Sequence, residues 1–263
     1  MLELQGIRKT FYPGTPNEKK ALNGVDLHLN AGDFVTIVGS NGAGKSTLFN
    51  AISGVFSVDE GTIRLDSKNI TNMKEYKRAY DIGRLFQDTM KGTAPNMTIE
   101  ENLALAYSRK AGKSFFAGNK QDREYFTELL KQLDLGLESR MKAKVGQLSG
   151  GQRQAVSLLM STISQPKLLL LDEHTAALDP ATAQIVLDIT TRIVSEGRIT
   201  TMMITHDMQA ALTLGNRTIM MDDGKIIFDI SGEERAKMTV EDLLECYHEN
   251  SRKKLTNDRM LLK

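Results

Sequence analysis

The sequence has a single cysteine, Cys246, and therefore cannot form a disulfide within the chain, which fits a reducing compartment. It also has no apolar run near the roughly 18 residues that a membrane-spanning helix needs. Its first residues, MLELQGIRKT, lack the basic and then apolar layout of a signal peptide. From these absences we expect a chain that stays in the cytosol.

Neither sign of charge is in excess. The 263 residues include 34 lysines and arginines and 33 aspartates and glutamates, so no overall field attracts nucleic acid or an anionic membrane. We therefore expect no nucleic-acid partner. An apolar share of 40% with 25% charged residues is typical of a soluble globular protein with a sizeable core, as one large or two small domains.

The first third of the sequence has the period of β-strands. Apolar residues alternate or run together in five segments, which are residues 2–4, 25–29, 34–39, 61–66 and 81–86. The pattern becomes helical at Thr98, which with Glu101 forms the sequence of a capping box. We therefore interpret residues 88–165 as a helical insertion.

Strand and helix signals alternate after this insertion. The expected strands are KLLLLD at 167–172, ITTMMITH at 199–206, RTIMMDD at 217–223 and KIIFDI at 225–230. A helix begins at Asp179-Pro180, a turn falls at Asp223-Gly224, and a last helix begins near Thr239, before basic residues 252–254 that we expect to be solvated. Apolar strands separated by helices indicate an α/β fold with a largely parallel sheet covered on both faces.

The segment GSNGAGKST, residues 39–47, matches the phosphate-binding pattern G-x-x-x-x-G-K-[ST] between a strand and a helix. Glycines let backbone N–H groups close around phosphate oxygens, Lys45 reaches the terminal phosphates, and Ser46 can ligate Mg²⁺. The alternative is a flexible glycine turn with an exposed lysine. The position of this segment between a strand and a helix favours nucleoside triphosphate binding. The expected contacts are Gly39, Ser40, Asn41, Gly42, Ala43, Gly44, Lys45, Ser46 and Thr47.

Two adjacent carboxylates, Asp172 and Glu173, follow the run of leucines at 168–171. A buried strand would bring both to its carboxyl end, which is where ligands bind in open α/β sheets. Asp172 is then expected to hold Mg²⁺ through water, and Glu173 to polarise the attacking water. The alternative is a pair of solvated acids at a strand end.

The segment LSGGQRQ, residues 148–154, has no explanation in a generic phosphate-loop enzyme. With it, the chain resembles the ATP-binding subunits of ABC transporters over nearly its whole length. Six motifs occur in that family's order: the phosphate loop, LFQD with Gln87, LSGGQ at 148–152, the acids at 172–173, ALDP around Asp179, and THD with His206. The resemblance implies a P-loop NTPase core with an N-terminal antiparallel β subdomain at 1–87 and 166–263, and an inserted helical subdomain at 88–165.

The resemblance also implies a head-to-tail dimer, in which ATP on the phosphate loop of one chain is capped by the LSGGQ segment of the other. The residues that would make this cap are Ser149, Gly150, Gly151 and Gln152. Glycines there permit close backbone approach, and a helix N-terminus favours the γ-phosphate. A homodimer suffices because this chain carries both halves of the site, and a heterodimer with a similar subunit is the alternative.

Further roles follow from the resemblance alone. Phe11 is matched to the aromatic residue that stacks on adenine, with Tyr12 as the neighbouring alternative. Gln87 would link Mg²⁺ and the attacking water to the helical insertion. Asp179 would reach across the dimer, and His206 would contact the γ-phosphate and orient the catalytic geometry together with Glu173. The catalytic set is then Glu173, His206, Lys45 and Gln87, and the metal ligands are Ser46, Gln87 and Asp172.

The implied activity is ATP hydrolysis that drives transport. Chains of this family without their own membrane span are common among bacterial importers, and this one looks most like amino-acid-type importers. The expected partners are integral membrane permease subunits and an extracytoplasmic substrate-binding protein, which places the chain at the cytoplasmic face of the membrane. The alternatives are a two-component exporter ATPase, which shares every motif, and a non-transport ABC ATPase, for which the sequence has no long coiled coil or second nucleotide-binding domain.

His174 occupies the position where the family that this chain resembles usually has proline. Mg²⁺ prefers oxygen ligands, and the other histidines form no ligand-spaced cluster with it, which argues against a metal site. We expect a structural role for His174, with a hydrogen bond that steadies the loop carrying Asp179.

Overall fold

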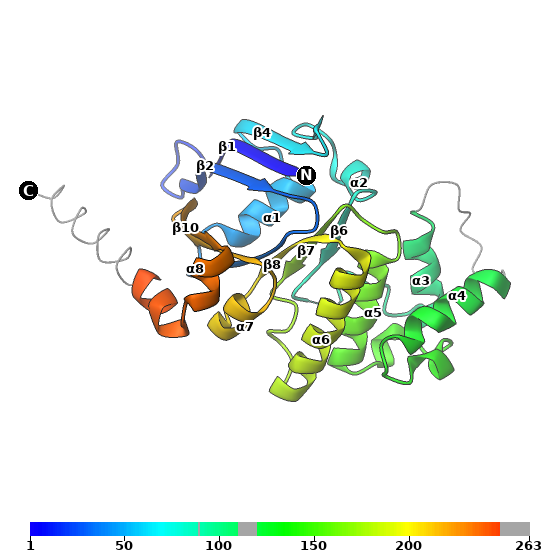
Figure 1. Ribbon diagram of the computed structural model, residues 1–263. Helices are drawn as coiled ribbons and strands as arrows, with labels where there is room; N and C mark the ends of the chain where they lie inside the picture. The colour runs from blue at the N-terminus through cyan, green and yellow to red at the C-terminus, as the bar shows by residue number, and fades with distance from the viewer. Residues whose placement is uncertain (89, 110–119, 248–263) are drawn as a thin grey trace, which may run out of the picture. The chain divides into compact units, whose positions relative to one another are not determined.

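The computed structural model describes residues 1–88, 90–109 and 120–247 (Figure 1). The chain forms two compact units. The first consists of Met1–Lys74 and the chain from Met202 onward, and the second of Glu75–Thr201. The division at residues 88 and 165 rests on the change from strand to helix pattern and on the family resemblance, and it stays a prediction. None of the helices among the described residues has the length and apolarity to cross a membrane.

The first unit contains an antiparallel sheet of order β2-β1-β4-β5, visible in blue and cyan in Figure 1. Its strands are β1 (Leu2–Phe11), β2 (Lys19–Leu29), β4 (Glu60–Leu65) and β5 (Lys68–Asn69). Leu2 pairs with Leu29 on one side and Leu65 on the other, and all three side chains are buried. The alternating apolar residues thus give this sheet one core face. The antiparallel β part of the expected fold is confirmed, whereas β5 was not predicted.

The second sheet contributes four strands to this unit, in the order β10-β9-β3-β8. These strands are β3 (Phe34–Gly39), β8 (Thr200–Ile204), β9 (Arg217–Asp222) and β10 (Lys225–Ser231). Strand β3 runs parallel to β9, and β10 returns antiparallel through the predicted turn at Asp223 and Gly224, which both have positive φ. Every residue of β3 before Gly39 is buried, so this strand provides a rigid base for the loop that follows it.

Short helices complete the first unit: α1 (Lys45–Ser53), α7 (Met208–Thr213), α8 (Gly232–Lys237) and a helix over residues 240–247. The last begins where the sequence predicted, because Thr239 and Asp242 exchange cap hydrogen bonds. Helix α8 was not predicted. Val38, Ala211, Met220 and Leu243 form a core cluster in this region and thereby join β3, α7, β9 and the last helix.

The second unit is mainly helical around two parallel strands, β6 (Ile82–Leu85) and β7 (Leu168–Asp172). Its helices are α2 (Glu75–Arg78), α3 (Ile99–Tyr107), α4 (Lys120–Lys131), the 3₁₀ turns Leu137–Arg140 and Val145–Gln147, α5 (Gly150–Thr162) and α6 (Pro180–Gly197). The predicted capping box at Thr98 and Glu101 is present in full. The four leucines at 168–171 are completely buried in β7. The chain is an α/β protein, as the sequence predicts.

Candidate nucleotide site

The phosphate loop connects the end of β3 to the start of α1 and depends on two close backbone approaches. Gly39 and Gly44 have φ values of 146° and 102°, a region that side chains disfavour. A Cβ on Gly44 would also lie 2.6 Å from the Ala21 carbonyl oxygen. Gly44 is the N-cap of α1 and has no side chain with which to cap the first turn. The loop thus presents a helix N-terminus to a ligand, as anion binding requires.

Lys45 is buried, with 5% of its surface exposed, although it carries a charge. Its Nζ donates to the carbonyl oxygens of Gly39 at 2.7 Å and Ser40 at 3.0 Å. The ammonium therefore lies against the inner side of the loop, and the neighbouring Ser46 side chain is exposed. A cation, a helix N-terminus and a hydroxyl at one place fit the terminal phosphates of a nucleotide and the oxygen-ligated Mg²⁺ that accompanies them.

Phe11, at the end of β1, is partly buried against Phe56. The two ring centroids are 5.4 Å apart in an edge-to-face arrangement, and the Lys9 Nζ lies 5.7 Å from the Phe11 ring. Tyr12, the alternative, is exposed and has a φ of 52°. Phe11 therefore has packing partners of its own, and its contact with adenine stays a prediction.

Lys19 also lies beside the phosphate loop, and sequence reasoning missed it. It is the register partner of Phe11 across the β1–β2 hairpin, and its Nζ is 3.5 Å from the position that a Cβ on Gly42 would occupy. A lysine pair at 19–20 ordinarily indicates a solvated surface. Only the pairing of β1 with β2 shows that one of the two lysines reaches the loop.

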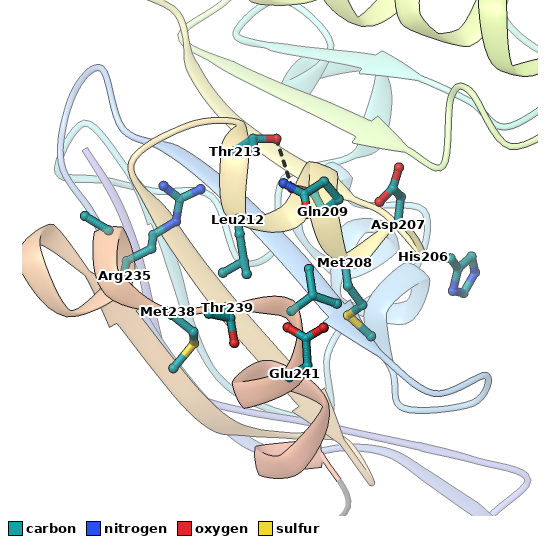
Figure 2. A pocket seen from close by; sticks show the side chains of 12 residues that line it. His206, Asp207, Met208, Gln209, Leu212, Thr213, Arg235, Met238, Thr239 and Glu241 are labelled. Carbon is teal, nitrogen blue, oxygen red and sulfur yellow. Dashed lines mark hydrogen bonds between the residues drawn. The ribbon is translucent and has the colours of Figure 1, made fainter.

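His206 follows β8 and is exposed at the edge of a groove of about 850 Å³, which Figure 2 shows from close by. The next residue, Asp207, caps α7 by accepting a hydrogen bond from the Ala210 N–H at 3.0 Å. On the other side of His206, the Thr205 N–H donates to the Ile37 carbonyl at 3.1 Å. The loop that carries His206 is thereby tied to β3, the strand that leads into the phosphate loop.

In the second unit, Asp172 ends β7 and pairs with Arg84 of the neighbouring strand β6. Asp172 Oδ2 is 3.5 Å from Arg84 Nη2, and both side chains are largely buried. Burial lowers the pKa of Arg84, an effect that the Asp172 charge opposes. Sequence reasoning missed Arg84, because its partner is 88 residues away. Gln87 lies exposed two residues after the end of β6.

Glu173 adopts a left-handed backbone conformation, with a φ of 48°. A residue with a side chain pays roughly 1 kcal/mol or more for this conformation, which persists where the surrounding structure enforces it. Such strain is concentrated at functional positions. The half-buried Glu173 is therefore held at the end of β7 in a defined direction.

The LSGGQ segment forms the start of α5, with Ser149 as its N-cap. Ser149 and Gln152 exchange cap hydrogen bonds of 3.3 Å in each direction. A Cβ on Gly150 would lie 3.1 Å from Leu178 Cδ2, and one on Gly151 would overlap Thr182 Cγ2. Gly151 is thus required by the packing of α5 against the start of α6, a cause within the chain that the sequence does not reveal.

Asp179 caps α6 by accepting from the Thr182 N–H at 3.1 Å, and Pro180 follows at the first helical position. The Thr182 side chain and backbone hydrogen bonds lower the pKa of the exposed Asp179 carboxyl group. The predicted helix start is confirmed. A contact of Asp179 across a dimer stays a prediction.

His174 is buried, with 3% of its surface exposed, and its Nε2 lies 3.2 Å from Thr190 Oγ1 on α6. Because the Thr190 hydroxyl donates to the Val186 carbonyl at 2.7 Å, His174 Nε2 must carry the proton and donate to Thr190. Burial lowers the pKa of His174 to about 4, so the ring is neutral at pH 7. The expected structural hydrogen bond exists, and it joins the loop after Glu173 to the helix that Asp179 caps.

The predicted site residues are therefore divided between the two units. The first unit carries Phe11, the phosphate loop at 39–47 and His206, and the second carries Gln87, residues 149–152, Asp172, Glu173 and Asp179. Among the residues that the structure describes, no group of three or more histidine, cysteine, aspartate or glutamate side chains is arranged to hold a metal ion by itself.

This chain is similar in sequence to known proteins. The family model described as "ABC transporter" matches residues 22–176. A tyrosine transport ATP-binding protein of Clostridioides difficile (strain R20291) is 42% identical over 245 residues, which are 93% of this chain and 98% of the relative. A methionine import ATP-binding protein of Clostridium tetani (strain Massachusetts / E88) is 32% identical over 86% of this chain and 68% of its own length.

This chain is also similar to solved structures of the same kind of protein. The ADP conformation of an ATP-binding cassette of an ABC transporter is 30% identical, with a TM-score of 0.77, and the match covers 94% of this chain and 98% of that one. A dimeric post-hydrolysis state of another cassette, bound to ADP and Pi, is 29% identical with a TM-score of 0.76, covering 88% and 98%.

Proposed function

Since this chain belongs to the ABC transporter family and is one of its ATP-binding, ATP-hydrolysing subunits, we propose that it powers the import of an amino-acid-like solute as a head-to-tail dimer. The observation that carries the proposal is the phosphate loop, with a buried Lys45 beneath it and a helix N-terminus at its end. The near-complete match to a tyrosine transport ATP-binding protein supports the cargo class.

The phosphate loop binds the nucleotide in this proposal. Backbone N–H groups of residues 40–47 surround the phosphate oxygens, and Lys45 leaves the carbonyls of Gly39 and Ser40 to pair with the terminal phosphates. Phe11 stacks on the adenine ring. The partly buried packing of Phe11 on Phe56 fixes the ring direction before ligand arrives and supports this role.

Mg²⁺ would be held by the oxygen atoms of Ser46, Gln87 and Asp172. This donor set fits the cation, because Mg²⁺ prefers hard oxygen ligands. When bound, Mg²⁺ neutralises the charge that develops on the phosphate oxygens. In the described structure Asp172 pairs with Arg84, which limits the rotation of the carboxylate.

Glu173 is the proposed base that polarises the attacking water. Its strained backbone supports a functional role, because the fold holds it in a conformation that costs energy. His206 is proposed to contact the γ-phosphate, and the hydrogen bond between Thr205 and Ile37 makes its loop an extension of β3. Both residues then act where charge develops in the transition state.

The second half of each ATP site would come from the other chain. Ser149 and the first turn of α5 cap the γ-phosphate, and Asp179 lies at the same interface. The exposure of Ser149 and Asp179 and the dimeric form of a solved relative support this arrangement. A homodimer provides two equivalent sites, and a heterodimer with a similar subunit provides the same geometry.

The proposed partners are integral membrane permease subunits at the cytoplasmic face of the membrane, together with an extracytoplasmic substrate-binding protein. The names of three relatives support transport of amino acids, which are tyrosine, methionine, and glutamate in Corynebacterium efficiens. Purification of the intact membrane complex, followed by transport assays with these three amino acids, tests both the partners and the cargo.

The catalytic assignment is tested by Glu173→Gln. This variant should bind ATP normally, lose most of its turnover and accumulate an ATP-dependent dimer, measured by size-exclusion chromatography with light scattering. Unchanged hydrolysis would remove Glu173 from the mechanism.

The composite site is tested separately by Ser149→Arg. Its long cation should block closure of the dimer and leave binding by the phosphate loop intact. A variant that still dimerises and hydrolyses ATP normally contradicts the shared site.

A further inference from the structure

Arg235 of α8 is a buried cation, with 9% of its surface exposed. In the described part of the chain no carboxylate pairs with it. Its guanidinium instead makes four hydrogen bonds: Nε to Thr218 Oγ1 at 2.8 Å, Nη1 to the Gly215 carbonyl at 3.0 Å, and Nη2 to the carbonyls of Ala211 at 3.0 Å and Leu214 at 2.5 Å. Each guanidinium nitrogen therefore has a neutral oxygen partner.

These partners explain how the fold tolerates this charge. Ala211 lies in the last turn of α7, and Leu214 is its C-cap, so Arg235 faces the negative end of the helix dipole. Burial lowers the pKa of Arg235, but arginine remains protonated in proteins. The planar fork of an arginine directs donors from three separate nitrogens in fixed directions, whereas a lysine donates from a single nitrogen.

The same carbonyl group connects Arg235 to the phosphate-loop strand. The Ala211 oxygen also accepts from Thr36 Oγ1 and from Thr218 Oγ1, each at 2.7 Å, and the two threonine hydroxyls are 2.9 Å apart. Thr36 is on β3, three residues before Gly39. This buried polar network therefore joins α8, the end of α7, β9 and the strand that leads into the phosphate loop.

Helix α7 connects the contacts of Arg235 to the loop that carries His206. It has six residues and is about 9 Å long, and a helix this short does not persist without tertiary contacts. Arg235 holds its C-terminal end, and the Asp207 cap begins its other end directly after His206. Figure 2 shows His206 and Arg235 on the same groove, one beside the start of α7 and the other from α8.

We propose that Arg235 is a positioning residue for ATP hydrolysis, which fixes the direction of His206 by holding the C-terminal end of α7. The inference rests on the proposed role of His206 in hydrolysis. Arg235 does not touch the nucleotide in this mechanism. It acts through a helix whose displacement would move His206 and leave the phosphate loop able to bind ATP.

The first test compares Arg235→Gln and Arg235→Lys with the control Lys237→Met. Lys237 is on the same helix, 79% of its side chain is exposed, and it pairs only loosely with Glu233 at 3.8 Å. Arg235→Gln should lower kcat at least 10-fold and leave KM for ATP within twofold, because binding by the phosphate loop is retained. Arg235→Lys keeps the charge at the helix end without the fork and should recover part of kcat. The control should retain full activity.

The second test observes His206 directly and needs no turnover. The chain has four histidines, so ¹³C-histidine labelling gives four ring signals that single replacements can assign. In Arg235→Lys, the His206 signal should shift or broaden, whereas the signal of exposed His28 on β2 should not. Circular dichroism identifies the folded variants, and Arg235→Lys decides the matter if Arg235→Gln does not fold.

A folded Arg235 variant with an unchanged His206 signal overturns the inference, whatever its kcat. A rise in KM with unchanged kcat overturns it as well. His206→Ala separates this failure from that of the proposed function: if that variant hydrolyses ATP normally, His206 has no catalytic role, and the NMR result still decides whether Arg235 positions it.

Discussion

The buried histidine next to Glu173 leads us to predict a specific dependence of stability on pH. His174 has a pKa of about 4 in the folded protein, because burial disfavours its charged form, against an ordinary value of 6.5. Between these values the unfolded chain binds a proton that the folded chain does not bind. The contribution of His174 to the free energy of unfolding is therefore fully present above pH 6.5 and decreases as the pH falls from 6.5 towards 4.

The magnitude follows from the size of the pKa shift. One pKa unit corresponds to about 1.4 kcal/mol, so lowering the pH from 7 to 5 should remove about 2 kcal/mol of stability through His174 alone. His174→Gln retains a side-chain N–H that can donate to Thr190 but has no group that titrates in this range. We expect this variant to lose about 2 kcal/mol less than the parent protein between pH 7 and pH 5.

The measurement is urea unfolding at both pH values, without nucleotide and with EDTA. Circular dichroism is the appropriate probe because the sequence has no tryptophan. Amide hydrogen exchange in α6 measures the local stability of the helix that His174 contacts. His28→Gln, which removes an exposed histidine, is the control and should behave as the parent. Equal losses of stability in the parent and His174→Gln would refute the buried, neutral ring.

Two further predictions concern contacts that only the structure reveals. Lys19→Gln should weaken ATP binding roughly 3- to 10-fold, with a smaller effect at high salt. The control Lys20→Gln should not weaken it, because the Lys20 side chain points to the opposite face of β2. Isothermal titration calorimetry compares the two variants, and equal affinities would remove Lys19 from the site. Gly151→Ala should destabilise the protein by about 1–2 kcal/mol in urea unfolding, because its methyl group overlaps Thr182 Cγ2. Thr182→Ser removes that methyl and should restore stability in the double variant; an unstable double variant would show that the contact is not the cause.

The parts of the fold that the sequence predicts are those whose cause lies within a few residues. The Thr98 capping box, the Asp179-Pro180 helix start and the Asp223-Gly224 turn each depend on neighbours no more than three or four positions away. Their hydrogen bonds form between groups that are adjacent in the chain whatever the tertiary fold. These elements therefore lie where the sequence placed them.

The contacts that could not be predicted are made between distant segments. Arg235, in the unpredicted α8, has the charge of an ordinary solvated residue, and only the approach of α8 to the end of α7 gives it buried partners. Arg84 reads as an isolated charge in a strand until β6 pairs with β7 and brings it to Asp172. His174 was expected to have a hydrogen-bond partner, but a sequence cannot show that the partner is Thr190 on α6.

The packing of Gly151 also decides which substitution can test the proposed sharing of each ATP site between two chains. A side chain at Gly151 disturbs the contact of α5 with Thr182 within one chain, so lost activity in such a variant has two explanations. Ser149 is exposed, and its cap hydrogen bonds are with Gln152 at the start of the same helix. Replacing Ser149 with arginine therefore leaves the packing of α5 on α6 intact and places its bulk where the second chain would bind. Loss of the Ser149 cap should cost about 1 kcal/mol of stability. If Ser149→Arg stays folded with no larger loss in urea unfolding and yet fails to form the ATP-dependent dimer, the failure belongs to the interface.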